Sequence, residues 1–537
     1  MIPILVAALW LPRTGAPVAA QAAETLPSFS YQLARAHELE PHRRTIPLVG
    51  VPSGSHQLRL KLVVSSTGSV SKADGQGDND ALKFWPAVRD EVSRWRFTPF
   101  EKAGRPVAAE VEEYIDLVPP ERLPLRHVQA PVIRPDSKVT ISLERAACYG
   151  TCPDYTVAVS TSGIVFEGRG FVVAQGKHTA SIDSDKVRSL AKRFVEADFY
   201  SMDPAYRALV TDCPTYRLTI AIDGQTKSVT DYMGSWEGMP AVITDLEGRT
   251  DSLAHTERWV EGAEGLVQAL LDERFNFQTF DAQMMLKEAA SRGQTMTVRG
   301  LLEAGVPLKL LPAPTAKESD IINPLEFSGW LTAASRHPDT VAVLIHAGAS
   351  RTDQRDKDLA LAGAAESGRL DAVRALIAYG ANPNADLDSL QITRHIAGIT
   401  WQDPYSGSVL IYAAESGNPE MIREILRYRP NLEARNREGK TAIFAAGASD
   451  SDDRDGARVE CVRLLAKAGA DVNARDKEGQ TPIFTVDDSV LSLLIRYGAN
   501  LNIRNNKGET VLDAARKTSP QRVEALRDAM QNVHTPK

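Results

Sequence analysis

The hydrophobic and polar residues of this chain follow two different periods. Between residues 46 and 262, apolar residues recur at every second position in several short runs, the period of a β-strand with one buried face. From about residue 280 to 530 they recur at helical spacing, in paired segments that end on glycine. The pattern predicts two small α+β domains followed by an all-α array.

Residues 46–118 are predicted to form the first α+β domain. Residues 58–64 alternate apolar and polar side chains, as in a half-buried strand. Residues 82–95 carry apolar side chains at helical spacing. A turn at residues 104–107 leads into a last strand that ends near Val118.

Residues 137–262 are predicted to form the second α+β domain. Alternating patterns occupy residues 139–143, 155–159 and 216–222. Asp223-Gly224 is a typical two-residue hairpin turn, and Ser184 is the expected cap of a helix. Between the two domains, residues 119–136 contain five prolines. Proline-rich segments are extended and semi-rigid, so this linker is expected to hold the two domains apart.

The second half of the chain is built from repeats. The segment Gly469–Phe484 (GADVNARDKEGQTPIF) recurs in related form from Gly498 and, degraded, from Arg429; its first part recurs at Gly380. A period near 33 residues with these motifs resembles ankyrin repeats. About seven units are expected between residues 280 and 530.

Two features of each repeat have a direct physical reading. A glycine follows the second helix, where the chain is expected to adopt the left-handed conformation that glycine tolerates best. An alanine pair marks the first helix, where small side chains allow the helices to approach closely. The glycines lie at 305, 348, 380, 469 and 498. Their uneven spacing predicts insertions, and a shortened sixth unit.

The N-terminal domain carries a second resemblance. Its WRFTPF and GRPV segments, at residues 95–100 and 104–107, resemble the C-terminal domain of TonB-type energy transducers. This resemblance implies a small sheet with helices on one face, which binds partner proteins by pairing with an extended strand. The family's membrane anchor and proline-rich spacer are missing upstream, so the resemblance implies partner binding, or a structural spacer, and not energy transduction.

The second α+β domain contains the motif CxGxCPxY at residues 148–155, followed by Tyr206, residues 211–212 and residues 231–232. This set resembles a bacterial family of envelope proteins of unknown function, which implies no activity.

Three cysteines, Cys148, Cys152 and Cys213, lie in this domain. In an exported protein they are expected to pair, either as Cys148–Cys152 or with Cys213 as the partner of either one. The alternatives are free or redox-active thiols, or a metal site with His178 as a fourth ligand. The C-x₃-C spacing is unusual for zinc.

The first 22 residues resemble a secretory signal peptide. Ile2 to Leu11 is an apolar run too short to span a bilayer, and Ala20-Gln21-Ala22 fits a cleavage site, so the mature chain is expected to begin at Ala23. A misplaced start codon or a short membrane anchor would be the alternative. Residues 23–45 are expected to be a linker, and no later segment is apolar enough to cross a membrane.

Composition and motifs argue against several classes of function. The net charge of −7 disfavours nucleic-acid binding, which needs a basic face. The sequence lacks the G-x-S-x-G, P-loop, H-E-x-x-H and Rossmann motifs, so no enzyme activity, cofactor or metal is predicted.

The expected function is protein–protein interaction or scaffolding in the periplasm of a bacterium. Arg437, Lys477 and Arg504 lie at hairpin tips of successive repeats. These tips should line up as a polar row with an excess of Arg and Lys that binds a protein partner. Trp401, in the inserted residues 386–405, should stand beside this row as an aromatic anchor. The alternative is an enzyme or thiol-redox protein whose site lies around Cys148, Cys152 and Cys213.

Overall fold

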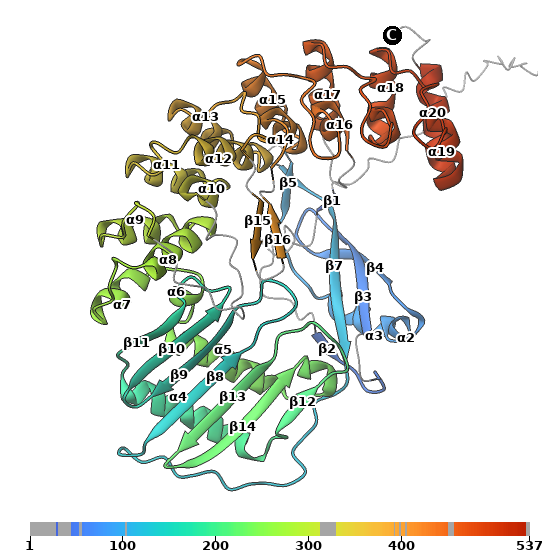
Figure 1. The fold of residues 1–537 in the computed structure, drawn as a ribbon. Coiled ribbons are helices and arrows are strands. Elements are labelled where there is room, and N and C mark those ends of the chain that lie inside the picture. Colours follow the sequence, from blue (N-terminus) through green and yellow to red (C-terminus); the bar gives the residue numbers. More distant parts are fainter. Residues whose placement is uncertain are drawn as a thin grey trace, which may run out of the picture. The chain divides into compact units, whose positions relative to one another are not determined.

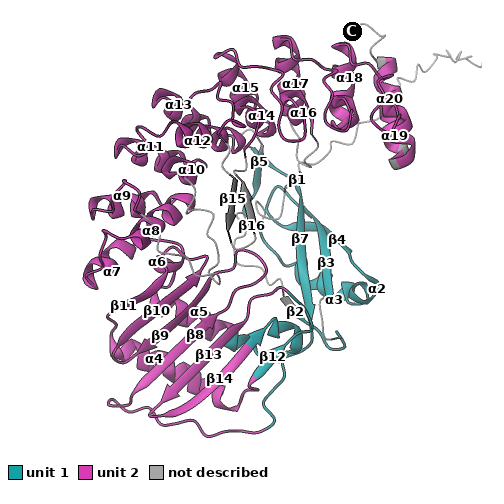
Figure 2. Cartoon of the chain, in the orientation of Figure 1, with its two compact units in different colours: residues 1–125, 205–211, 231–243 teal, residues 126–204, 212–230, 244–537 magenta. Residues whose placement is uncertain are grey.

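The structure is a computed structural model, which describes most of the chain. The described residues are 28–29, 45–52, 56–102, 105–311, 329–390, 393–396, 399–402, 405–448 and 456–532. The predicted signal peptide and nearly all of the predicted linker 23–45 lie outside them. The chain divides into two compact units, drawn in different colours in Figure 2. The first unit comprises residues 1–125, 205–211 and 231–243, and the second comprises the rest.

The first unit contains a five-stranded sheet with the order β1-β7-β3-β4, in which β2 also pairs with β7. Its elements are β1 (Ser28–Phe29), β2 (Thr45–Pro47), β3 (His56–Val64), β4 (Val70–Gln76), α2 (Asn79–Leu82), α3 (Trp85–Val92), β5 (Phe100–Lys102), β6 (Arg105–Val107) and β7 (Ala109–Val118). Alternate residues of β3 are buried, as the sequence pattern predicts. Helix α3 ends at Val92, so the buried Trp95, which was expected to belong to the helix, follows it by three residues. Strand β1 lies within residues 23–45, which were expected to be a linker.

The middle domain is a seven-stranded sheet with the order β11-β10-β9-β8-β13-β14-β12 (Figure 1). Its strands are β8 (Val139–Arg145), β9 (Asp154–Ser160), β10 (Gly163–Gly170), β11 (Gly176–Ala180), β12 (Ala205–Arg207), β13 (Tyr216–Ile222) and β14 (Gln225–Tyr232). Its helical elements are α4 (Ser184–Glu196), η1 (Phe199–Ser201), η2 (Gly234–Glu237), α5 (Ala241–Ala254) and α6 (Glu257–Val260). Asp223 and Gly224 both have positive φ, as a type I′ hairpin turn requires. The cap of α4 is Asp183 and not Ser184.

Two segments next to the middle domain pack against the folded chain. Its packing does not stop at residue 262, because α7 (Leu266–Asp272) also contacts β11. The proline-rich segment 119–136 is not a free spacer. Within the first unit, the Arg122 backbone N–H donates to the Gly238 carbonyl at 2.7 Å. The Arg122 guanidinium also lies 5.0 Å from the centre of the Tyr206 ring. Prolines keep this segment extended, but its backbone groups bond to the folded chain.

The C-terminal array consists of helix pairs that stack in order along a curved row (Figure 1). The pairs in the described part of the chain are α8 (Phe280–Ser291) with α9 (Thr295–Glu303), α10 (Trp330–Ala334) with α11 (Pro338–His346), α12 (Gln354–Glu366) with α13 (Leu370–Ala378), α14 (Val409–Glu415) with α15 (Pro419–Leu426), α16 (Ala442–Gly447) with α17 (Ala457–Ala468), η4 (Pro482–Phe484) with α18 (Asp488–Arg496), and α19 (Val511–Thr518) with α20 (Pro520–Asn532). In the sixth pair, a single 3₁₀ turn replaces the first helix, which accounts for its shorter sequence.

The array is not all-α, because one connection carries a β-hairpin. Strands β15 (Thr393–Ile396) and β16 (Ile399–Gln402) pair antiparallel between the third and fourth helix pairs. At the base of this insertion Asp386 bridges to Ser408, and the Leu387 N–H donates to the Gly407 carbonyl at 2.9 Å. Helical periodicity in the flanking segments therefore predicted the helix pairs but missed the strands between them.

Side chains at one repeat position join neighbouring units. The Asn473 side chain donates to the Gly498 carbonyl at 3.0 Å and accepts from the Asn500 N–H at 2.8 Å. Two units earlier, the Asn384 side chain donates to the Tyr428 carbonyl at 2.8 Å. Because each bond crosses to the next unit, the loops that follow the second helices are fixed relative to one another.

The ends of the second helices confirm the role expected for glycine. Gly305, Gly348, Gly380, Gly469 and Gly498 all have φ between +81° and +102°. The fourth unit has Arg429 at this position, with φ +51°. The next residue is Pro430, which has no N–H, so it cannot make the bond that Ala499 N–H makes to the Leu494 carbonyl at 2.9 Å. The fourth unit therefore keeps the left-handed turn, although it lacks both the glycine and the backbone N–H that would follow it.

Arg429→Gly is expected to stabilise the fourth unit by about 1 kcal/mol, because glycine removes the Cβ penalty of a left-handed residue. The measurement is hydrogen exchange of peptides from α14 and α15, which reports local unfolding in a multi-domain chain. Gly498→Arg is the matched reverse change. A Cβ at Gly498 would meet nothing within 4 Å, so a comparable loss of protection in α18 would come from φ alone. Unchanged protection in both variants would contradict the prediction.

Candidate functional site

The hairpin tips of the last units share one hydrogen-bonded turn. Asn436, Asp476 and Asn505 hold equivalent positions, and a side-chain oxygen of each accepts two backbone N–H groups of its own tip. These bonds are 2.9 to 3.0 Å long. Since each tip satisfies its own backbone groups, its exposed side chains are presented from a fixed turn.

Arginines at a second equivalent position link one tip to the next. Arg435 donates to the carbonyls of Gly439 in its own tip and of Arg475 in the following tip. Arg475 in turn donates to the Arg504 carbonyl at 2.9 Å. We call Arg435, Arg475 and Arg504 the arginine ladder. The repeated R-[N/D]-x-x-G pattern is the sequence signal that would have identified it.

Backbone bonds join the tips as well. The Lys477 N–H donates to the Glu438 carbonyl at 3.0 Å, and the Asn506 N–H donates to the Glu478 carbonyl at 2.9 Å. The Arg437 N–H donates to the Ser406 hydroxyl, at the base of the β15–β16 insertion, at 3.1 Å. We call this continuous row, from Ser406 through the tips 436–440, 476–480 and 505–509, the tip strip.

The structure separates the three basic residues predicted to form one row. Arg437 and Lys477 occupy equivalent, exposed positions on successive tips. Arg504 belongs instead to the arginine ladder: its guanidinium donates to the Gly508 carbonyl at 2.6 Å and lies 3.6 Å from the Asp513 carboxylate. Asn506 takes the position equivalent to Arg437. The sequence prediction grouped Arg504 with Arg437 and Lys477 by charge, whereas the structure places it at a different repeat position.

The tip strip carries charges of both signs. Glu438 and Glu478, directly after Arg437 and Lys477, are exposed. Glu438 forms an ion pair with Lys440 at 2.6 Å. The strip is thus a mixed-charge surface.

Trp401 lies in β16, opposite Arg394 of β15, and its side chain lies outside the described residues. The predicted insertion emerges from the connection that is equivalent to the other tips, because Asp386 and Ser408 bridge at its base. The insertion is therefore an elongated tip at the end of the strip.

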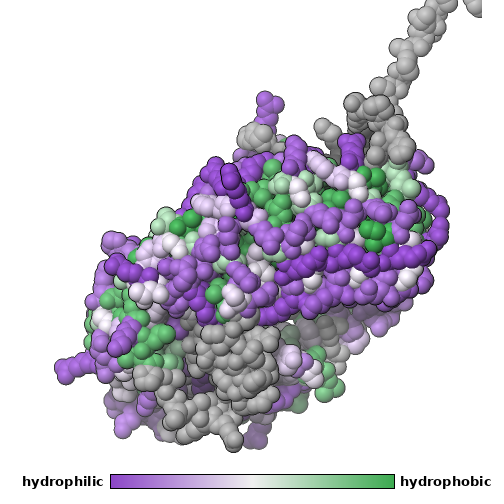
Figure 3. Space-filling view, turned by 45° about the horizontal axis from the view of Figure 1, so that its top comes forward, coloured by the Kyte–Doolittle hydropathy of each residue, from purple (hydrophilic) through white to green (hydrophobic). Residues whose placement is uncertain are grey.

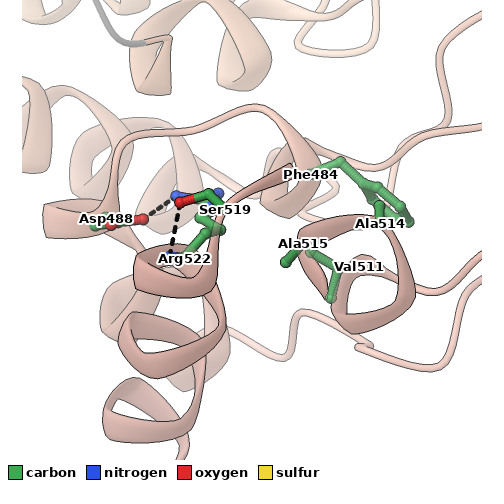
Figure 4. A pocket seen from close by; sticks show the side chains of 7 residues that line it. All are labelled: Phe484, Asp488, Val511, Ala514, Ala515, Ser519 and Arg522. Carbon is green, nitrogen blue, oxygen red and sulfur yellow. Dashed lines mark hydrogen bonds and ion pairs between the residues drawn. The ribbon is translucent and has the colours of Figure 1, made fainter. Parts of the chain in front are cut away.

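A small hollow separates the sixth and seventh units, where η4 replaces a full helix. Figure 4 shows its lining, with Phe484 and Val511 on one side and the Asp488–Arg522 ion pair on the other. Its volume of about 260 Å³ is smaller than that of typical ligand pockets. On the face drawn in Figure 3, hydrophilic residues form continuous bands between small apolar patches.

The cysteines of the middle domain are in two states. Cys148 and Cys152 form a disulfide with a Cα–Cα distance of 5.5 Å, and Cys213 is free and half-buried. The disulfide closes a short loop, on which Tyr149 is 89% exposed.

His178, expected as a possible metal ligand, is engaged elsewhere. Its Nδ1 lies 2.7 Å from a Glu273 carboxylate oxygen, and its Nε2 lies 2.9 Å from the Gln175 carbonyl. A carbonyl oxygen only accepts, so Nε2 carries a proton and neither nitrogen is directed at a metal. Among the described residues, no group of His, Cys, Asp and Glu has the arrangement of a metal site. Both ring nitrogens of His178 are thus engaged in hydrogen bonds within the domain.

A polar cluster joins both ends of the disulfide loop to α5. Arg145 and Tyr155 flank the loop, and both bond to the Asp251 carboxylate, at 2.5 and 2.8 Å. Thr256 donates to the same carboxylate at 2.9 Å. Burial, together with the Asp251 charge, raises the pKa of Tyr155, so its hydroxyl stays a neutral donor. Every partner is satisfied within the domain, which is the arrangement of a structural cluster and not of a reactive one.

Comparisons with known proteins agree with two of the three resemblances. Residues 385–476 match the family model of ankyrin repeats (3 copies). The C-terminal region contains ankyrin repeats. Residues 139–254 match the family model of a domain of unknown function, DUF6438. The crystal structure of the human ASB11 ankyrin repeat domain is 22% identical, over 47% of this chain and 98% of its own, with a TM-score of 0.34. No described helix has the length and apolar character needed to cross a bilayer.

Arg475→Ala is expected to destabilise the tips by about 1 kcal/mol, because it removes a charge-assisted bond between two units. Lys477→Ala, on the same tip, is the matched control and should be nearly neutral, since the Lys477 side chain is not part of the ladder. Hydrogen exchange of residues 475–510 measures both effects. Equal exchange in the two variants would contradict the structural role of the ladder.

Proposed function

We propose that the ankyrin array binds a protein partner along the tip strip. Ankyrin repeats indicate a protein–protein interaction role, and the bonds between successive tips support this surface in particular. A strip whose turns are already fixed loses little conformational entropy when it binds a partner. The smaller entropy cost of binding favours affinity. The Arg437, Lys477, Glu438 and Glu478 side chains are exposed on this fixed backbone.

The partner surface that suits this strip also has mixed charge. Basic and acidic side chains alternate along the tips, so a partner needs the complementary alternation to avoid like-charge contacts. Exposed charges at an interface chiefly set the association rate and its salt dependence. The elongated tip with Trp401 would add an aromatic contact at one end.

We also propose that the protein acts outside the cytoplasm, in a bacterial envelope. The proposal rests on the apolar run and cleavage pattern of residues 1–22. The likeness of residues 137–262 to envelope proteins and the Cys148–Cys152 disulfide support it, since disulfides persist in oxidising compartments.

The role is proposed to be non-enzymatic binding. One second candidate has its own observation: β4 is the last strand at one end of the order β1-β7-β3-β4 in the first unit. A free edge can pair with an extended strand of a partner, as the TonB-like resemblance implies.

Reversing two tip charges, Arg437→Glu with Lys477→Glu, is expected to reduce partner capture from an envelope fraction several-fold, measured by quantitative mass spectrometry. The remaining capture should be less sensitive to salt. The matched control reverses Lys467 and Arg496, which are exposed on second helices away from the tips. The control should capture the same proteins as the unmodified chain.

Equal capture by the tip variant and the control would refute binding at the strip. In that case, a proline substitution at Ser71 or Ala73 of β4 would test the sheet edge, because proline cannot donate a backbone bond to an added strand.

The mature chain is expected to begin at Ala23 and to be found in the periplasmic or secreted fraction. N-terminal mass spectrometry of each cell fraction measures this directly. An intact Met1 on protein in the cytosolic fraction would contradict export while leaving the binding proposal open to its own test.

A further inference from the structure

A small pocket lies between α4 and the proline-rich segment that precedes the middle domain. Just after the end of α4, the Val128 N–H donates to the Ser201 hydroxyl at 2.8 Å. Near the start of α4, residues 133–135 line one side of a pocket of about 250 Å³, and the helix lines the other side. The segment and the helix therefore run side by side, and the pocket forms between them.

Both walls of this pocket are fixed by the fold. On the segment side, the Arg134 N–H donates to the Ser137 hydroxyl at 2.9 Å, and this hydroxyl donates to the Asp223 carboxylate at 2.8 Å. Asp223 lies in the turn between β13 and β14, so the segment is tied to the sheet. On the helix side, Val187 and Leu190 of α4 are buried in the core of the domain. The pocket is therefore formed before any ligand binds.

The helix contributes polar groups to the pocket. Its lining includes Asp185, Arg188, Ser189 and Lys192 of α4, whose spacing of three, four and seven residues places them on one face of the helix. The Arg188 guanidinium is oriented by two bonds, to the Ser184 hydroxyl at 2.6 Å and to the Asp185 carboxylate at 2.8 Å. This ion pair offsets the negative charge of Asp185.

The lining has an excess of positive charge. Of the described residues that form it, Arg134, Arg188 and Lys192 are cations and Asp185 is the one acid, which leaves a balance of two positive charges. The whole chain, in contrast, has a net charge of −7. Among the described residues, no side chain pairs with the exposed Lys192 ammonium. The pocket is therefore a local site of attraction for an anion.

We propose that this pocket binds a phosphoryl group of the kind that phosphate monoesters carry. Near neutral pH such a group has a charge of about −1.5 to −2, which matches the balance of the lining, whereas a carboxylate has a single charge. A guanidinium binds two phosphate oxygens at once, and an ammonium adds a compact positive charge. The Ser189 hydroxyl can donate to a further oxygen.

The size of the pocket also favours a small anionic group. Drug-sized ligands need pockets of about 300–1,000 Å³, so this pocket has room for a head group while the rest of the molecule stays in solvent. The phosphoryl group can belong to a soluble phosphate monoester or to the head group of a lipid, since both present the same oxygens. The site is independent of the tip strip.

The first experiment titrates the full-length chain with glycerol 3-phosphate in a calorimeter. Saturable binding is expected, and acetate should bind at least about tenfold more weakly. Arg134→Ala with Lys192→Ala should lower the affinity for glycerol 3-phosphate by about tenfold or more, because charge-assisted bonds are lost. Absence of saturable binding, or acetate binding of equal strength, would overturn the proposal.

Lys186→Ala with Arg193→Ala is the matched control. It removes two exposed cations from α4, and neither residue lines the pocket. The control should bind glycerol 3-phosphate as tightly as the unmodified chain. Equal weakening in the two double variants would indicate only a general attraction to the helix and would overturn the site.

Flotation with vesicles distinguishes the two sources of the phosphoryl group. Vesicles of phosphatidylcholine with phosphatidic acid should carry the unmodified chain, and not the Arg134→Ala, Lys192→Ala variant, if the source is a lipid. Flotation with neither vesicle, together with calorimetric binding of glycerol 3-phosphate, would assign a soluble monoester. Flotation that is unchanged in the double variant would overturn the lipid as the source.

A last experiment uses the unmodified chain and needs no substitution. An N-hydroxysuccinimide ester acetylates accessible lysines, and mass spectrometry compares the rates at Lys192 and at Lys186 on the same helix. Glycerol 3-phosphate should slow acetylation of Lys192 several-fold and leave that of Lys186 unchanged. Equal rates at Lys192 with and without the ligand would overturn the proposal.

Discussion

The array depends on burial of its first helices between neighbouring units. Helices α10, α12, α14 and α16 contact one another in succession, and the alanine pairs Ala364-Ala365 and Ala413-Ala414 are fully buried in this row. No single pair could bury such a helix by itself, so each unit is stable only because its neighbours cover it. The second helices and the tips then follow the geometry that this close packing sets.

The hairpin tips form an ordered surface on the packed helices. Their backbone groups are satisfied by Asn436, Asp476 and Asn505, and the arginine ladder connects one turn to the next. The exposed charges therefore stand on a framework that is already ordered. A partner would meet a fixed row of side chains, which favours selection by charge pattern over adaptation of loops.

The middle domain is held together by a different set of interactions from the array. Its sheet positions a short disulfide loop, and a half-buried carboxylate, Asp251, bonds to both ends of that loop. Cysteine spacing alone leaves all pairings of Cys148, Cys152 and Cys213 open, whereas the structure joins Cys148 to Cys152.

The sequence by itself determined the elements whose cause is local. Alternation predicted β3, β8, β9 and β13, and recurring glycines and alanine pairs predicted the helix pairs, because strand faces and left-handed turns are properties of a few adjacent residues. Tertiary structure decided the rest. It placed Arg504 in the ladder, gave His178 the Glu273 carboxylate, and continued the middle domain to α7. Each of these outcomes depends on contacts between residues that are far apart in the sequence. A local sequence pattern cannot predict such a contact.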